Sequence, residues 1–414
     1  DKLHPSRRQT LMMMGAAGAA GLMGPSAIGR DQAFAANADT SGQLVLGFSQ
    51  EPTVFNPLMP HIEVDEGVYY AMFDPLWDFD PKGELFPLLA AEVPTVANGG
   101  ISADGKQWKV KLKEGVTWHD GKPFTAADVK ATFDLLNDPD FRSFRTTGYK
   151  LMKNITVVSD TEITWEMEST FAPMAGILAS TFIVPAHAFE GVEDKNNAPF
   201  NNAPFGTGPF KFKSRLAGDH IEFEANPDYH SDGPYLSTFI IKYVPDLNVL
   251  YTQFKAGDID VIGLQYISPD HLSEAEKLAG KVVEITGRGS FESIGLNMTR
   301  PQFKEKAVRQ ALYLAIDKVS IIDALYYGVP TPTESYMPQE SYYYNPDLPK
   351  HEFSLEKAKA LLDEAGWVPG ADGIREKDGV RLAFSNSTTA GNHLREQAQQ
   401  FLQQSFKEIG AEME

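Results

Sequence analysis

Two short motifs in this 414-residue sequence carry residue types that could do chemistry. Asp258 and Asp260 stand two residues apart, and paired carboxylates are the acid–base machinery of glycoside hydrolysis. Gly206-Thr207-Gly208 has the glycine spacing of a loop that cradles phosphate groups. Asp258 lies in a tight glycine turn, however, where its side chain bonds nearby backbone groups. Since the glycine motif also lacks the lysine and the following helix of a P-loop, we predict structural turns at both places.

Other catalytic and metal-binding arrangements are missing from the sequence. It contains no cysteine, which excludes disulfides, thiolate metal sites and a cysteine nucleophile. It has no G-x-S-x-G motif, and none of its nine histidines forms a His-x-x-x-His pair beside a glutamate. We therefore expect no enzyme, no catalytic residue, no cofactor and no metal site. A two-carboxylate hydrolase is kept as the less favoured alternative.

The charge and the N-terminal residues indicate an acidic, exported protein. A net charge of −19 argues against a nucleic-acid partner, which would require basic patches. Ser6-Arg7-Arg8-Gln9-Thr10-Leu11 precedes a glycine- and alanine-rich apolar run over 12–28, and Ala33-Phe34-Ala35 offers a cleavage site. This order predicts a twin-arginine signal peptide over residues 1–35 and a periplasmic location. The alternative is a chance Arg-Arg pair before a buried helix.

Beyond the predicted signal, hydrophobic spacing predicts mostly strands first and mostly helices later. Leu44, Leu46 and Phe48 alternate as in a half-buried strand, and Thr125 with Asp128 forms a capping box that opens a helix. The predicted strands cover 43–50, 106–112, 155–158, 162–167, 210–214, 220–224, 239–244, 261–262, 282–286 and 291–296. Further helices are predicted over 247–255, 269–279, 307–316, 321–326, 354–365 and 392–409. This order favours an α/β chain with at least two lobes, because single cores rarely exceed about 300 residues.

Several strings in the sequence share their order and spacing with one protein family. They are Trp118–Val129, Gly206–Phe210, Asn226–Tyr229, Gly257–Asp260, Val308–Lys318 and Ser354–Phe384. The last is the most specific, because it joins a capped helix, a stop at Gly366, a glycine-rich hairpin and a strand. Together they resemble the family 5 extracellular solute-binding proteins, which are the dipeptide-, oligopeptide- and nickel-binding proteins of bacterial ABC importers. One departure is His230, which stands where tryptophan is usual.

The resemblance implies the cluster C type of periplasmic-binding-protein fold. Lobe I would occupy 36–287 with an inserted subdomain at about 80–205, lobe II would occupy 288–414, and hinge closure would enclose a solute between them. The family's second lobe continues further and then returns to lobe I. We therefore expect a C-terminally truncated chain that lacks the aspartate with which peptide-binding members pair the peptide's amino group. We also expect that residues 36–414 alone do not bind ligand with native affinity.

The expected ligand contacts in lobe I lie in loops and at strand ends. Thr53, Val54 and Phe55 would offer backbone groups to an extended ligand, as a strand adds to a sheet edge. The alternative is a surface loop pinned by two prolines. Tyr149 stands where relatives lend an aromatic residue to the pocket, and an ordinary core tyrosine is the alternative. Ser180 is a further candidate.

Two more groups of expected contacts come later in the chain. Gln265 and Tyr266 follow the strand 261–262, and ligands of open α/β sheets favour such strand ends. Ser293, Gly295 and Asn297 alternate along the strand that enters lobe II, so one face of that strand would look into the cleft. For Asn297 the alternative is that it satisfies the hinge backbone.

The predicted activity is binding without chemistry. We expect a monomeric solute receptor that binds a peptide or a similarly sized solute and delivers it to an ABC permease in the inner membrane. The same scaffold in relatives also binds oligosaccharides, opines and metal chelates, and these remain the alternative ligands.

Overall fold

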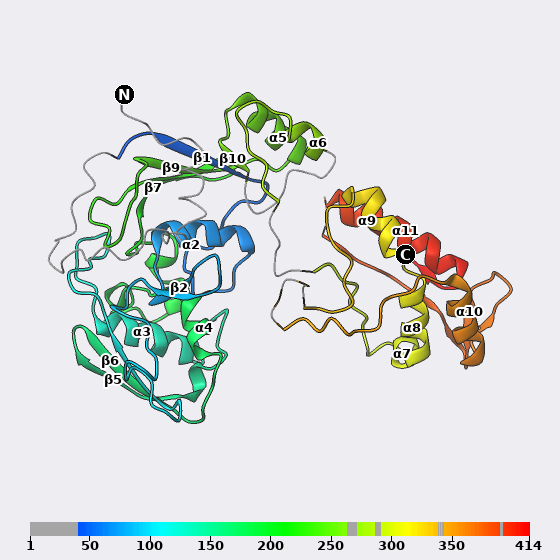
Figure 1. The fold of residues 1–414 in the computed structure, drawn as a ribbon, viewed down its shortest axis with the longest axis horizontal. Helices are drawn as coiled ribbons and strands as arrows, with labels where there is room; N and C mark the ends of the chain where they lie inside the picture. Colours follow the sequence, from blue (N-terminus) through cyan, green and yellow to red (C-terminus); the bar gives the residue numbers. More distant parts are fainter. Residues whose placement is uncertain are drawn as a thin grey trace. The chain divides into compact units, whose positions relative to one another are not determined.

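The computed structural model describes residues 40–262, 271–285, 291–337, 339, 341, 343–389 and 392–414 (Figure 1). The chain divides into two compact units, unit 1 (residues 1–267) and unit 2 (residues 268–414). Each unit has a hydrophobic core of its own. The predicted signal peptide and the predicted lobe boundary at 287/288 lie outside the described residues.

Unit 1 contains most of the strands. They are β1 (Gln43–Phe48), β2 (Trp77–Phe79), β3 (Leu85–Pro87), β4 (Gln107–Lys111), β5 (Met152–Ser159), β6 (Glu162–Met167), β7 (Phe210–Leu216), β8 (His220–Ala225), β9 (Thr238–Tyr243) and β10 (Val261–Ile262). Its helices are α2 (Glu66–Met72), α3 (Ala126–Asn137), α4 (Met174–Ala179) and α5 (Leu247–Ala256).

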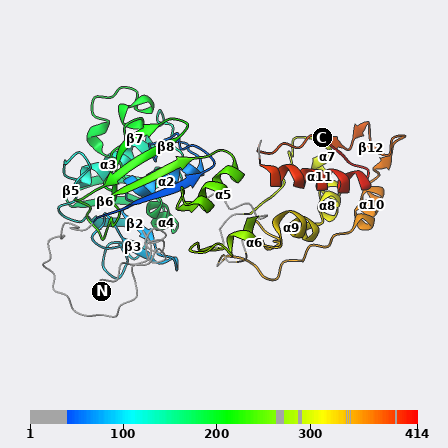
Figure 2. The same cartoon turned by 90° about the horizontal axis from the view of Figure 1, so that it is seen from above.

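A five-stranded mixed sheet forms one part of unit 1. Its order is β10-β1-β9-β8-β7, with β1 parallel to both neighbours and the remaining pairs antiparallel. Helix α2 packs closely on this sheet, since a Cβ added to Gly67 would lie 2.9 Å from the Phe48 ring (Figure 2). The carboxylate of Asp260 accepts the N–H of Val45 at 2.9 Å, so this residue has a structural role in holding β1 to the segment that leads into β10.

The chain leaves this sheet after β1 and returns to it at β7. Between these strands it builds the antiparallel sheet β4-β6-β5, the pair β2-β3 and the helices α3 and α4. Helix α3 packs on β5 and β6, where Trp108 stacks on Trp165 at 5.5 Å and Phe133 meets the edge of Trp165 at 5.7 Å. The predicted capping box is confirmed, because Thr125 caps the first turn of α3 and Asp128 bonds back to the Thr125 N–H.

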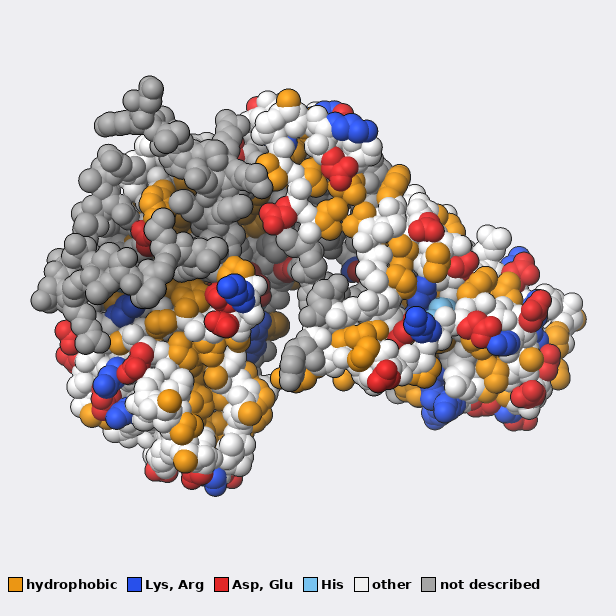
Figure 3. All heavy atoms as spheres, in the orientation of Figure 1, with side chains coloured by type: hydrophobic (Ala, Val, Ile, Leu, Met, Phe, Trp, Pro, Cys, Tyr) orange, Lys and Arg blue, Asp and Glu red, His pale blue; other side chains and the backbone are white. Residues whose placement is uncertain are grey.

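Unit 2 is mainly helical in the residues that the structure describes. Its elements are α6 (Leu272–Ala275), α7 (Pro301–Lys304), α8 (Lys306–Leu314), α9 (Lys318–Tyr326), α10 (Leu355–Glu364), α11 (His393–Glu408), β11 (Val368–Pro369), β12 (Arg375–Lys377), β13 (Val380–Arg381), β14 (Ala383–Phe384) and β15 (Glu412–Met413). Helices α8 and α10 pack together around Val308, Leu312 and Leu362. Acidic and basic side chains are interspersed over the visible face of this unit (Figure 3).

Three predicted elements differ from the structure. The strands predicted over 282–286 and 291–296 are wrong in their described parts, which pair with no other described strand. A strand is defined by its partner, and alternating residues alone do not supply one. The helix predicted over 269–279 shortens to the single turn of α6.

Candidate ligand-binding site

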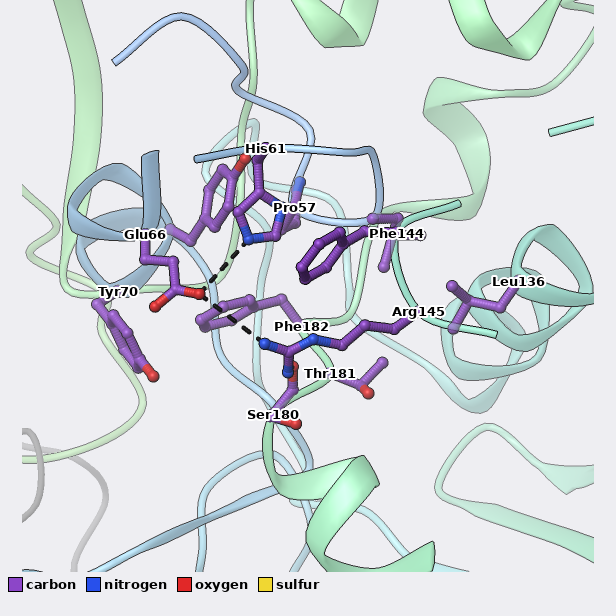
Figure 4. Close-up of a pocket in the computed structure, with 12 residues that line it drawn as sticks. Pro57, His61, Glu66, Tyr70, Leu136, Phe144, Arg145, Ser180, Thr181 and Phe182 are labelled. Carbon is purple, nitrogen blue, oxygen red and sulfur yellow. Dashed lines mark hydrogen bonds and ion pairs between the residues drawn. The ribbon is translucent and has the colours of Figure 1, made fainter. Parts of the chain in front are cut away.

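A hollow in unit 1 is the candidate binding site in the described part of the chain. It is a shallow concavity of about 70 Å³ that is open to solvent, and its walls come from five segments. These segments are the loop before α2, helix α2 itself, Leu136 of α3, the loop 144–145 and the residues 180–182 that follow α4 (Figure 4). The hollow therefore depends on tertiary packing of segments that are far apart in the sequence.

A buried carboxylate shapes the loop that borders the hollow. Asp65, which is fully buried, accepts the N–H groups of Thr53, Val54 and Ile62 at 2.6, 3.1 and 2.9 Å. The hydroxyl of Tyr69 in α2 donates to the Val54 carbonyl at 3.0 Å. A buried carboxylate is costly unless several donors bond it. The bonds of Asp65 to these N–H groups therefore hold the loop 53–62 against the start of α2.

Three charged or titratable side chains form a row across the hollow. His61 Nε2 lies 3.5 Å from Glu66 Oε1, and that same oxygen lies 3.9 Å from a guanidinium nitrogen of Arg145. Figure 4 shows Glu66 and Arg145 pointing toward one another from opposite sides. The hydrogen bond from His61 is the main cause that lowers the pKa of Glu66, helped by the charges of His61 and Arg145 and opposed by burial. Glu66 is therefore an anion at neutral pH.

Aromatic rings form the walls around these charges. Phe144 lies 4.4 Å from the His61 ring, and Tyr70 meets the edge of Phe182 at 5.3 Å. Tyr70 and Phe144 line the hollow and stay 50% and 47% exposed, so both rings present surface to it. Partial burial is the largest cause that raises the pKa of Tyr70 to about 12, so this group keeps its proton. The hollow thus offers aromatic surface and hydrogen-bonding groups to a solute.

The predicted contacts at Thr53, Val54 and Phe55 belong to the loop before α2 but are not among the residues that line the hollow. The Thr53 and Val54 N–H groups already bond Asp65, and the Val54 carbonyl already accepts from Tyr69. The Phe55 side chain is 3% exposed and lies in the core of unit 1. Ligand contact by these three residues stays a prediction, and these internal bonds count against the backbone part of it.

Tyr149 is buried in the core of unit 1, whereas Ser180 is exposed at the hollow. Tyr149 is fully buried, shares a 2.6 Å hydrogen bond with Thr181 and packs on Phe133. These contacts favour the alternative that Tyr149 is an ordinary core tyrosine. Ser180 is exposed and lines the hollow, with its hydroxyl donating to the Ile177 carbonyl at 3.1 Å. Among the predicted contacts described in unit 1, Ser180 is therefore the one that lines the hollow.

The remaining predicted contacts cannot all be placed. Gln265 and Tyr266 lie outside the described residues. In unit 2, Ser293, Gly295 and Asn297 are exposed and alternate with two half-buried residues that pack on the unit 2 core. The Asn297 side chain accepts the N–H and hydroxyl of Thr299, which matches the alternative of a backbone-satisfying role.

Sequence reasoning missed most of the hollow. His61, Glu66, Tyr70, Phe144 and Arg145 belong to no motif, and their sequence spacing carries no periodic signal. Within the described ranges, no group of three His, Asp or Glu side chains could hold a metal ion. The described helices are also all too short or too polar to cross a bilayer.

The comparisons with known proteins agree on one class. The family model for "Bacterial extracellular solute-binding proteins, family 5 Middle" matches residues 84–414. The oligopeptide-binding protein AppA of Bacillus subtilis is 33% identical over 383 residues, which cover 90% of this chain and 68% of AppA. These findings define the class as an extracellular solute-binding protein.

Solved structures show the same fold. AppA of Bacillus subtilis in complex with a nonapeptide aligns with a TM-score of 0.79 and 32% identity, covering 91% of this chain and 74% of that one. NikZ from Campylobacter jejuni in complex with Ni(L-His) aligns with a TM-score of 0.81 and 26% identity, covering 90% and 73%. The predicted fold class is confirmed.

The chain belongs to the family 5 bacterial extracellular solute-binding proteins. The function that the resemblance implied is likewise confirmed: this is a solute-binding component of an ABC importer.

Proposed function

We propose that the solute is a peptide or a molecule of similar size, and that the hollow of unit 1 forms part of its site. The observation that carries this proposal is the pairing of exposed aromatic rings with a charged row in one concavity. Ligand pockets are concave and mostly apolar, with a few polar groups that fix orientation. The AppA structure with its nonapeptide supports a peptide over the oligosaccharide, opine and metal-chelate alternatives.

The proposed mechanism is a shift in a binding equilibrium. A solute seated on Phe144 and Tyr70 favours the closed form of the protein, and an ABC permease reads that form. The lobes proposed for this mechanism are 36–287, with the insertion at about 80–205, and 288–414. No bond of the solute is made or broken, so the protein is not an enzyme. Export by the twin-arginine route to the periplasm, as a monomer, completes the proposal.

A thermal-shift experiment tests this function. The full-length protein encoded by its gene, rather than residues 36–414 alone, is heated with an equimolar mixture of synthetic tri- to nonapeptides, and the mixture is analysed afterwards by mass spectrometry. We expect the Tm to rise with peptide concentration while every peptide keeps its mass, because binding to the native state alone stabilises it. Cleavage of the peptides would contradict the binding mechanism, and an unchanged Tm would contradict peptide as the solute.

A pair of variants locates the site. Phe144→Ala removes an exposed ring of the hollow, and Phe79→Ala removes a similarly exposed ring, at 43%, that does not line it. We expect Phe144→Ala to reduce the peptide-induced rise in Tm and Phe79→Ala to leave it unchanged. Equal effects of the two substitutions would place the site elsewhere.

A further inference from the structure

The guanidinium of Arg145 holds more hydrogen-bonding capacity than the described residues use. Guanidinium carries five N–H donors in a planar fork. Here it donates one long hydrogen bond, 3.4 Å to the Ser180 carbonyl, and it lies 3.9 Å from Glu66. The side chain is 44% exposed and points into the hollow from the loop 144–145 (Figure 4). Several donors therefore face the space that a solute would fill.

The carboxylate of Glu66, unlike the guanidinium of Arg145, has a titratable or charged partner on two sides. Its carboxylate is approached by His61 on one side and by Arg145 on the other, and it is 33% exposed. A cationic group entering the hollow would meet the attraction of Glu66 together with the repulsion of Arg145. An anionic group would meet the attraction of Arg145 together with the repulsion of Glu66. It can still reach guanidinium donors that Glu66 leaves open, because the 3.9 Å separation is longer than a direct hydrogen bond.

A second donor stands nearby. Tyr70 of α2 is half exposed, keeps its phenolic proton at neutral pH, and meets the edge of Phe182 at 5.3 Å. Figure 4 shows its hydroxyl directed away from the His61 side of the row. Arg145 and Tyr70 thus approach one space from two different elements.

We propose that Arg145, with Tyr70 as a second donor, forms a subsite in unit 1 for a carboxylate of the solute. The planar fork binds the two carboxylate oxygens side by side, which is the strongest and most directional form of charge-assisted hydrogen bonding. Glu66 lies 3.9 Å from the guanidinium, too far for a direct hydrogen bond, so the fork stays available to the solute. This subsite rests on the proposed function and specifies which chemical group of the solute unit 1 recognises.

The test uses matched pairs of carboxylates and amides. The full chain is incubated with an equimolar set of tri- to nonapeptides with free C-termini, with the same peptides as C-terminal amides, and with di- and tricarboxylic acids and their monoamides. The retained compounds are weighed by mass spectrometry after ultrafiltration. We expect carboxylates to be retained about ten- to hundredfold over their amides, the range of a lost charge-assisted pair.

Variants separate the subsite from general charge. Arg145→Gln is expected to abolish the preference for carboxylates, and Arg145→Lys to keep part of it, because lysine retains the charge and loses the fork. Arg142→Gln, an equal charge change in the same exposed loop, is expected to leave the preference intact. Glu66→Gln is expected to retain it.

The outcomes distinguish the subsite from the proposed function. If peptides are retained and their amides are retained equally, or if Arg145→Gln keeps the preference, the subsite is wrong while the peptide function stands. If only non-peptide acids are retained, with a preference that Arg145→Gln removes, the peptide function fails and the subsite stands. Retention of no compound by a folded protein would overturn both.

Discussion

A buried carboxylate, Asp74, ties three segments of unit 1 together at the residue scale. It accepts hydrogen bonds from Thr207 at 2.9 Å and from Tyr229 at 3.2 Å, and it pairs with the buried His230 at 2.9 Å. Burial alone would raise the pKa of Asp74, but the charge of His230 and these hydrogen bonds hold it below its ordinary value. Asp74 therefore stays ionised inside the protein.

We expect Asp74→Asn to lower the free energy of unfolding by about 1–3 kcal/mol at pH 7, because it removes the carboxylate that the buried side chains of Thr207, Tyr229 and His230 share. Asp134→Asn is the control, since its 2.7 Å pair with Lys130 lies on the surface, where the loss is about 0.5 kcal/mol. Urea unfolding of the two variants measures both values. Similar losses would show that the buried network adds little.

The lowered pKa of Asp74 also predicts how the stability of the fold changes with pH. An unfolded aspartate titrates near pH 3.9, and the folded pKa is lower, so the stabilisation is complete above about pH 4. It is lost as the pH falls through the folded pKa. We expect the stability advantage of the wild type over Asp74→Asn to shrink below about pH 4. An advantage that stays constant down to acid unfolding would contradict this assignment.

His61 gives a second prediction at the residue scale. Burial lowers its pKa, but the hydrogen bonds to Glu66 and to the Met59 carbonyl, with the charges of Glu66 and Asp65, raise it above 6.5 in balance. NMR titration should show this raised pKa, and Glu66→Gln should move it downward. The pair stabilises the fold fully below about pH 6.5 and loses its effect as the pH rises through the folded pKa. An unchanged His61 pKa in the Glu66→Gln variant would contradict the contact between His61 and Glu66.

Residues with local roles were predictable from the sequence, and residues of the hollow were not. Thr125 and Asp128 announce a helix start because both partners lie within one turn. Arg145 meets Glu66 only through packing of a distant segment, and no motif marks the nearby pair of His61 and Glu66. Tyr149 shows the same limit, since only the fold reveals that its ring is enclosed.

At the scale of elements, the Gly206–Gly208 turn shows why glycine is required there. The Gly208 N–H donates to the Met72 carbonyl at 2.9 Å. A Cβ added to Gly206 would lie 1.8 Å from the Met72 oxygen, and a Cβ added to Gly208 would lie 2.5 Å from the Met72 carbonyl carbon. The obstacle is backbone at the end of α2, which cannot rotate away. The motif that resembled a phosphate loop is a close contact between two segments.

Alanine substitutions test this contact. Gly208→Ala should destabilise unit 1 by about 1–3 kcal/mol or more, the usual effect of overpacking against atoms that cannot move. Gly176→Ala in α4 is the control, since its added Cβ meets the Phe79 ring at an ordinary 3.6 Å and alanine favours a helix by up to about 1 kcal/mol. Thermal unfolding compares the two. A neutral Gly208→Ala would contradict the close approach.

Helices were easier to predict than strands for a physical reason. Helix α10 is capped by Ser354 and is followed by Gly366 with φ of +82°, so both of its ends are written in nearby residues. The segments 282–286 and 291–296 alternate like strands, but pairing with another segment decides that state. Ile294 and Leu296 still pack toward the core of unit 2, so the alternation was meaningful for burial.

At the scale of the whole molecule, the family and the fold do not determine which solute is bound, because the side chains of the site determine it. The family 5 scaffold is shared by an oligopeptide complex and a nickel–histidine complex among solved structures. In this chain, the described hollow supplies aromatic surface from Phe144 and Tyr70 and an open guanidinium from Arg145. These groups favour a peptide with a free carboxylate over a neutral solute.

The central claim is that this protein carries a peptide-sized solute unchanged. The most direct test is native mass spectrometry of the full chain purified from its bacterial host, followed by identification of the small molecules released on denaturation. We predict one bound peptide per chain, which leaves on dilution with its mass intact. A bound sugar or metal chelate, or the release of a cleaved product, would contradict the claim.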